Sequence, residues 1–154
     1  MITLKRILIA TDFSEASEVA VRYGRALADA FGASLDILHV MEDPFVYAPT
    51  SEGYLPPAHF FEEMEKNSRE RLEQALPHAD REKLNARLVT KKGSPFVEIV
   101  RYAKSENIDL IVMGTHGRGP IAHMLMGSVA EKVVRKAPCP VLTVRSPEHE
   151  FVMP

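Results

Sequence analysis

Two short apolar runs restrict the fold of this 154-residue chain more than any other feature of its sequence. Residues 7–10 and 110–113 have no polar interruption, which is typical of strands buried on both faces of a parallel sheet. Residues 34–40, 85–90 and 140–144 also have strand character, and helical patterns separate these segments. The alternation of strand and helix predicts a single doubly wound α/β domain with a five-stranded parallel sheet.

Four amphipathic patterns are expected to form the helices between these strands. The first begins after Ser14, a good N-cap, and ends at Gly32; its apolar face is expected to hold Ala16, Val19, Ala20, Tyr23, Leu27 and Ala30. The second covers residues 58–76, with a stripe of Phe61, Met64, Ser68, Leu72 and Ala75. The third opens at Ser94 and Pro95, with Val97, Val100 and Ala103 facing inward, and the fourth covers residues 129–136 with Ser128 as its N-cap. Residues 41–57, rich in proline, are expected to form an irregular loop.

The order of the strands follows from two rules. Crossovers between parallel strands are right-handed, and the two most apolar strands, the first and the fourth, should lie centrally. The predicted order is therefore 3-2-1-4-5, with helices on both faces and a switch of winding direction between the first and fourth strands. Ligands in such sheets bind at the carboxyl ends of the strands beside this switch. Thr11, Asp12 and the residues from Gly114 to Gly117 are expected there.

A glycine motif follows the fourth strand. Gly114 and Gly117 are followed by nine further residues and then by Gly127 and Ser128, which precede the last helix. Glycines allow backbone N–H groups to approach an anion, and a helix N-terminus attracts negative charge, so the motif predicts a phosphate cradle. An ordinary strand-to-helix loop with a capping serine explains the same spacing equally well. Walker, dinucleotide and nucleophile-elbow motifs are missing from the sequence.

Each part of the expected site has a chemical role. The amides of residues 116–120, with Gly127, Ser128 and Val129, could hold phosphates, and Arg118 and His116 would add positive charge. Asp12 could accept hydrogen bonds from ribose hydroxyls, and the backbone near Val40 could contact the edge of a base. Residues 115–136 carry a net charge of +3, which favours an anion, although the lysines and arginine of the last helix would also serve simply as its solvated face.

Composition excludes several classes of protein. The net charge is −2, so the chain as a whole has no electrostatic bias toward nucleic acid or an anionic membrane. Cys139 is the single cysteine, which rules out an internal disulfide and is expected to be a buried filler. The N-terminal apolar runs are too short for a signal peptide, and no stretch approaches a membrane span. We expect a cytoplasmic protein with one domain at residues 1–146 and a tail at 147–154.

Five segments of the sequence carry a family resemblance: residues 7–14 (Ile-Leu-Ile-Ala-Thr-Asp-Phe-Ser), 38–40, 109–119, 127–129 and 139–144. Through them the chain resembles the universal stress protein family, from about Leu4 to Arg145. The nucleotide-binding branch of that family carries the motif G-x2-G-x9-G-S/T, which this sequence fits without insertion. The resemblance implies an adenine nucleotide α-hydrolase-like fold and ATP bound by Ala10, Thr11, Asp12, Val40, Met113, Gly114, Thr115, His116, Gly117, Arg118, Gly119, Pro120, Gly127, Ser128 and Val129. One departure is Ala10, where some ATP-binding members have proline.

The resemblance also implies a homodimer paired through Val141–Val144. An apolar edge strand is usually covered or paired, and coverage by the C-terminal tail in a monomer is the alternative. We expect an ATP-binding regulatory or stress-response protein whose nucleotide occupancy is read by a protein partner that the sequence does not identify. Two alternatives are a slow ATPase, with Mg or Mn held through the phosphates, and a nucleotide-free interaction module. The preference for ATP over AMP or another adenine nucleotide stays open.

Overall fold

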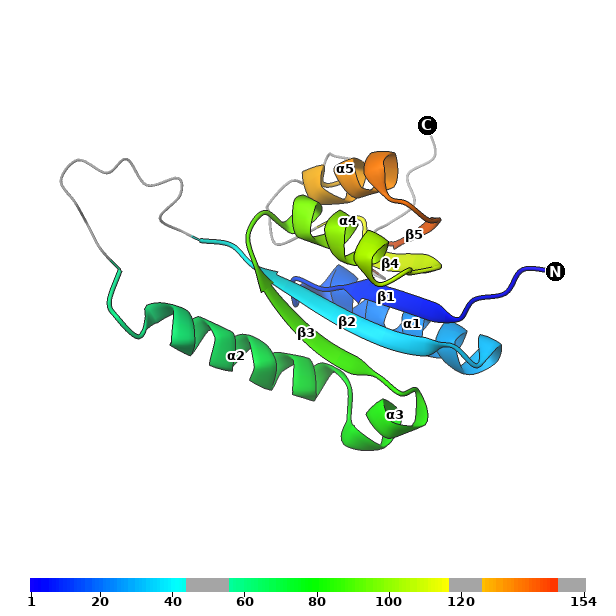
Figure 1. Ribbon diagram of the computed structural model, residues 1–154, viewed down its shortest axis with the longest axis horizontal. Coiled ribbons are helices and arrows are strands. Elements are labelled where there is room, and N and C mark those ends of the chain that lie inside the picture. Colours follow the sequence, from blue (N-terminus) through cyan, green and yellow to red (C-terminus); the bar gives the residue numbers. More distant parts are fainter. Residues whose placement is uncertain (44–55, 117–125, 147–154) are drawn as a thin grey trace.

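The computed structural model describes residues 1–43, 56–116 and 126–146. Five parallel strands form one sheet in the order β3-β2-β1-β4-β5, which confirms the predicted order 3-2-1-4-5 (Figure 1). The strands are β1 (Arg6–Ala10), β2 (Ser34–Met41), β3 (Arg87–Lys92), β4 (Leu110–Gly114) and β5 (Val141–Val144). The two apolar runs lie side by side at the centre, where helices cover both faces.

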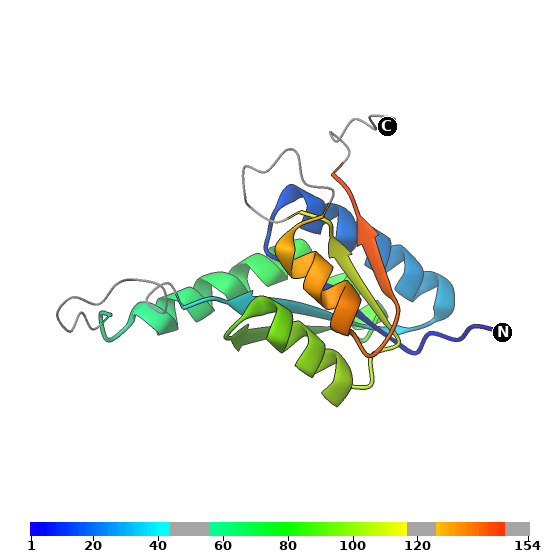
Figure 2. The same ribbon diagram turned by 90° about the horizontal axis from the view of Figure 1, so that it is seen from above.

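Helices lie on both sides of the sheet, as Figure 2 shows from above. They are α1 (Glu15–Phe31), α2 (Phe60–Ala75), α3 (His78–Lys83), α4 (Pro95–Ser105) and α5 (Ser128–Lys136). On one face, α1 and α2 pack over a cluster that includes Ile7, Ile9 and Ile37. On the other, α4 and α5 pack over a cluster that includes Leu8 and Ile111. No helix within the described ranges is long and apolar enough to span a membrane.

Helix α1 begins and ends as predicted, and Ala16, Val19 and Ala20 are buried as expected, but the rest of its buried face differs from the expected one. Tyr23 is 53% exposed, and Ala30 is exposed as well. Gly24 contacts the sheet instead: a Cβ on it would lie 2.4 Å from Cδ1 of Ile9. Because the helix approaches β1 closely at this glycine, the residues turned inward are Ala16, Ser17, Val19, Ala20, Val21, Gly24 and Ala28. The large side chain at Tyr23 could not occupy that contact.

Three smaller expectations are corrected. Ser128 is the first residue of α5 and not its N-cap, because Gly127 has the extended backbone of a cap and its carbonyl accepts from Glu131 N at 3.0 Å. The short helix α3 was not expected, and β3 begins two residues later than the predicted strand. The buried face of α4 is centred on Ile99, Tyr102 and Ala103, while Val97 and Val100 are only half-buried.

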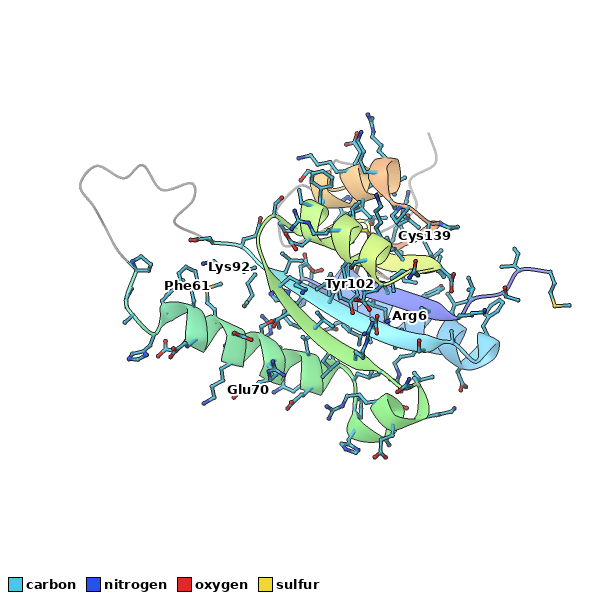
Figure 3. All side chains as sticks on the ribbon, in the orientation of Figure 1. Arg6, Phe61, Glu70, Lys92, Tyr102 and Cys139 are labelled. Carbon is cyan, nitrogen blue, oxygen red and sulfur yellow. The ribbon has the colours of Figure 1, made fainter. Side chains whose placement is uncertain are left out.

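Other expectations agree with the structure or lie outside it. The stripe on α2 faces the sheet, with Ser68 and Leu72 buried. Lys92 Nζ lies 3.3 Å from the centroid of the Phe61 ring, which attaches the first turn of α2 to the end of β3 (Figure 3). Cys139 is half-buried against the α4–α5 cluster, as expected of a filler, and burial raises the pKa of its thiol. Most of the expected 41–57 loop and all of the 147–154 tail lie outside the described residues.

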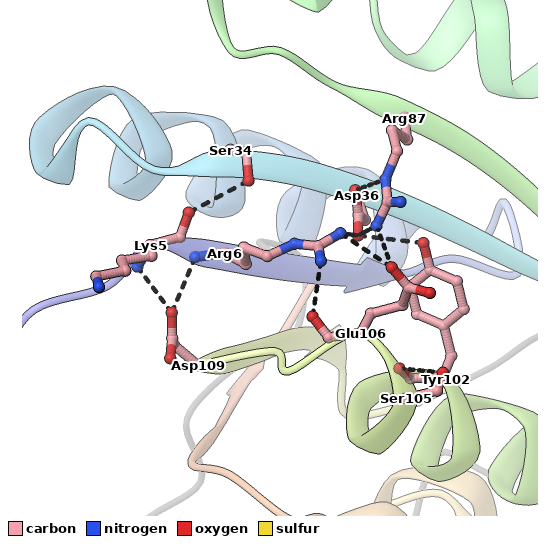
Figure 4. Close-up of polar contacts among 9 residues, drawn as sticks. All are labelled: Lys5, Arg6, Ser34, Asp36, Arg87, Tyr102, Ser105, Glu106 and Asp109. Carbon is pink, nitrogen blue, oxygen red and sulfur yellow. Dashed lines mark hydrogen bonds and ion pairs between the residues drawn. The ribbon is translucent and has the colours of Figure 1, made fainter.

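An ion network joins β1, β2, β3 and α4 near the amino ends of the strands (Figure 4). At its centre Asp36 is 2% exposed and accepts from Arg87 Nε at 2.8 Å and Arg87 Nη2 at 2.7 Å. Arg6 Nη2 and the Tyr102 hydroxyl each donate to Asp36 Oδ2 at 3.1 Å, and Glu106 Oε2 accepts from both arginines. Burial raises the pKa of Tyr102 to about 12, so its hydroxyl remains a donor. The network ties α4 to the half of the sheet that carries β3.

Candidate functional site

A pocket of about 570 Å³ opens at the carboxyl ends of the strands, beside the switch point between β1 and β4. Its volume is within the usual range for small-molecule sites, roughly 300–1,000 Å³. Every expected site residue within the described ranges lines it: Ala10, Thr11, Asp12, Val40, Met113, Gly114, Thr115, His116, Gly127, Ser128 and Val129. Four others, Gly117, Arg118, Gly119 and Pro120, lie outside the described residues. The fold therefore brings together two sequence segments more than 100 residues apart.

The turn after β1 presents Asp12 to the pocket. Its Oδ1 accepts from Ser14 N at 2.9 Å and from Ser17 Oγ at 2.6 Å, and Ser17 is the buried residue at the start of α1. Burial alone would raise the pKa of Asp12, but the hydrogen bonds from Ser14 and Ser17 outweigh it and hold the pKa below its ordinary value. The carboxylate is thus ionised at neutral pH and can accept hydrogen bonds from hydroxyl groups of a ligand.

Gly114 has a packing role that the glycine motif did not reveal. A Cβ at this position would lie 2.8 Å from Ala16 Cβ and 3.0 Å from the carbonyl carbon of Ala16. The first distance is shorter than real Cβ contacts, and the second, to backbone that cannot rotate away, is tighter than most of them. Gly114 therefore permits β4 to cross the first turn of α1 closely. The close packing of these two elements explains a glycine at this position even without a ligand.

The two ends of the glycine motif meet at Thr115. Gly127 N donates to Thr115 O at 2.6 Å, and Thr115 N donates to Val144 O at 2.8 Å. The Thr115 hydroxyl also lies 2.9 Å from His116 Nδ1. The bond from Gly127 holds the start of α5 against the end of β4, and the bond to Val144 ties the same end of β4 to β5.

The N-terminus of α5 faces the same pocket. Ser128, Val129 and Ala130 form its first turn and line the pocket with Gly127. The first N–H groups of a helix have no acceptor within the helix, and they coincide with the positive end of its dipole. Such a terminus is suited to binding a phosphate or carboxylate group.

Sequence reasoning missed an apolar half of the pocket. The lining that it did not include is apolar at Leu38, Met41, Met64, Pro95, Ile99 and Ala130 and polar at Ser17, His39 and Glu42. Met64 comes from the apolar stripe of α2, and Pro95 and Ile99 come from the start of α4, whose amino end must lie near the carboxyl ends of the strands. The position of the start of α4 beside the pocket could have been inferred from the predicted topology. The apolar half offers surfaces on which a flat ring can pack.

His39 fits its expected role as a packed, hydrogen-bonded strand residue, and it also lines the pocket. Its Nδ1 lies 2.9 Å from Thr11 O, and its ring centroid is 4.4 Å from that of Phe13. Among the residues that the structure describes, no group of three or more His, Cys, Asp or Glu side chains could hold a metal ion. The described pocket thus combines an ionised carboxylate, a helix N-terminus and an apolar wall.

Comparisons with known proteins agree with this geometry. The model of the universal stress protein family matches residues 3–145. A universal stress protein from Thermus aquaticus is 40% identical over 147 residues, which cover 92% of this chain and 98% of the relative. Among solved structures, the universal stress protein UspA from Lactobacillus plantarum has a TM-score of 0.72 at 26% identity, covering 94% of this chain and 100% of that one. A universal stress protein in complex with cAMP has a TM-score of 0.63 at 25% identity, covering 94% and 99%.

Proposed function

We propose that this chain, which belongs to the universal stress protein family, binds an adenine nucleotide in its pocket and that ATP is the first nucleotide to test. The observation that carries the proposal is the meeting of three features in one pocket: the ionised Asp12, the N-terminus of α5 and an apolar wall. A nucleotide has a matching hydroxyl-bearing sugar, phosphates and a flat base. The relative solved with cAMP supports an adenine nucleotide.

Each part of the nucleotide has a complementary part of the pocket. The base would pack between Ile99 and the end of β2, with the backbone near Val40 at its edge. The ribose hydroxyls would donate to Asp12, and the phosphates would accept from the amides at Gly127 and the first turn of α5. A divalent cation, Mg or Mn, would be held through the phosphates. We propose that occupancy of this site regulates a cytoplasmic stress response through a protein partner.

The proposal is tested by calorimetric titration of nucleotide-free protein with ATP, AMP and cAMP. Asp12→Asn keeps the size of the side chain but removes its charge, so we expect it to weaken ATP binding roughly tenfold or more, because hydrogen bonds to a charged group contribute about 1.5–3 kcal/mol. Glu18→Gln removes an exposed carboxylate from the first turn of α1, the helix that follows Asp12, and should leave the affinity for ATP unchanged. A wild-type protein that gives neither binding heat nor a thermal shift with any of the three would refute the proposal.

We also propose a homodimer paired through β5. This strand is at the edge of the sheet, and Val141, Leu142 and Thr143 are only half-buried. Ile111 N donates to Pro140 O and Thr115 N to Val144 O, so the parallel ladder places the Thr143 N–H on the outer side.

Thr143→Pro tests this dimer, since proline on an edge strand removes the outward N–H without removing a bond to β4. We expect analytical ultracentrifugation to show a dimer for the wild type and a shift toward monomer for the variant. Circular dichroism should show that the variant keeps its fold. A wild type that sediments as a monomer at all concentrations would contradict the proposed dimer.

A further inference from the structure

Phe13 has an unusual backbone conformation beside the pocket. Its φ is +62°, and the other non-glycine residues with positive φ in the described ranges are Asn85 and Asn107. Asparagine adopts this left-handed region comparatively easily, whereas a bulky aromatic residue does so at a cost in strain. Strained backbone of this kind persists only where surrounding contacts hold it, and such residues cluster at functional sites. Phe13 directly follows Asp12.

The contacts that hold Phe13 come from three other parts of the fold. Its ring centroid lies 4.4 Å from that of His39 on β2, with the two planes tilted by 38°. Arg71 of α2 places its guanidinium carbon 4.2 Å from the same centroid, in cation–π geometry. Its backbone N–H donates to Thr11 Oγ1 at 3.0 Å. The ring is thus fixed by one side chain from the sheet and one from a covering helix.

The turn at Phe13 determines where its neighbours point. Because the chain turns back at this residue, Ser14 N reaches Asp12 Oδ1 at 2.9 Å and Ser17 Oγ reaches it at 2.6 Å. Three pocket-lining residues are therefore connected to Phe13: Thr11 by a hydrogen bond, Asp12 through the backbone and His39 through ring contact. If the left-handed turn relaxed, Asp12 would lose its hydrogen bonds and its direction.

We propose that Phe13 is a positioning residue of the pocket: held between His39 and Arg71, its ring maintains the left-handed turn that presents Asp12 to the hydroxyl groups of a bound nucleotide. The inference rests on the proposed nucleotide function for its ligand. It assigns α2 a part in binding, since Arg71 secures the ring while Met64 of the same helix lines the pocket.

Phe13→Gly separates backbone strain from ring contact. Glycine accepts the positive φ without strain. If the turn needed only a residue that tolerates this φ, the Phe13→Gly variant would bind ATP as well as the wild type or better. Positioning by the ring predicts the opposite: a Kd for ATP raised about tenfold in calorimetry, at temperatures where the variant is fully folded. Phe13→Tyr keeps the ring and should stay within about twofold of the wild type. Asn107→Gly changes another left-handed residue, between α4 and β4, and should leave the Kd unchanged.

A second measurement tests the inference without any nucleotide. Hydrogen bonds from Ser14 and Ser17 hold the carboxyl pKa of Asp12 below its ordinary value, and an NMR titration would follow this pKa in each variant. Phe13→Gly should raise that pKa toward the ordinary value, whereas Asn107→Gly should not. If the wild type fails to bind nucleotide, the proposed function falls while this titration still decides the role of Phe13. An unchanged Asp12 pKa in Phe13→Gly, or an unchanged Kd, would overturn the inference.

Discussion

Replacing Asp36 with alanine should lower the free energy of unfolding by about 3 kcal/mol, near the lower end of the cost of breaking a buried ion pair. Asp36 is almost completely buried and accepts four hydrogen bonds from Arg6, Arg87 and Tyr102. Its loss leaves two guanidinium groups facing a cavity, with Glu106 as their remaining ion-pair partner among the described residues. Because the Arg87 side chain is 46% exposed, solvent compensates for part of the loss. Urea denaturation at neutral pH measures the difference.

A surface ion pair supplies the control for Asp36. Asp80 pairs with Arg25 on the outside of the molecule, where both side chains reach solvent. Asp80→Ala should cost about 0.5 kcal/mol, as exposed pairs do. Equal costs for the two variants would show that the Asp36 network does not hold the sheet and α4 together.

Substituting alanine for Gly114 should destabilise the fold by about 1–3 kcal/mol, the usual cost of an added methyl group in a packed site. The new Cβ would overlap Ala16, including its backbone, so β4 and the start of α1 would have to separate. The shift would be transmitted to Thr115, which holds Gly127 by a hydrogen bond, and to Asp12 at the other side of the pocket. We therefore expect a lower melting temperature together with weaker ATP binding.

Gly32→Ala is the matched control for Gly114. Apart from the two chain neighbours of Gly32, no atom of the described residues lies within 4 Å of a Cβ built on it, but its φ of +63° is unfavourable for alanine. That variant should lose about 1–2 kcal/mol of stability through backbone strain alone and keep its affinity for ATP. If Gly114→Ala were as stable as the wild type, the close crossing of β4 and α1 would be wrong.

Much of the fold was predictable because its main determinants are local. The apolar runs at residues 7–10 and 110–113 identify central strands, and Ser14 and Gly32 mark the ends of α1. Given these elements, the handedness of crossovers leaves few ways to order a parallel sheet. The buried face of α1 was predicted correctly at Ala16, Val19 and Ala20. It was wrong at Tyr23, because Gly24 is adjacent and only the distance to Ile9 decides between them. The hydrophobic periodicity of the α1 sequence does not predict that distance.

The candidate site, like the fold, has features that the sequence predicted and features that it did not. The amino-acid sequence by itself determined the sheet order, the switch point and the set of residues expected there, since strand ends and glycine spacing are readable along the chain. Only the tertiary structure decided that Met64 of α2 joins the apolar wall, that Gly114 is required by α1, and that Phe13 is held in a strained turn by His39 and Arg71. These features depend on contacts between segments far apart in sequence, and such contacts exist only after the layers have packed.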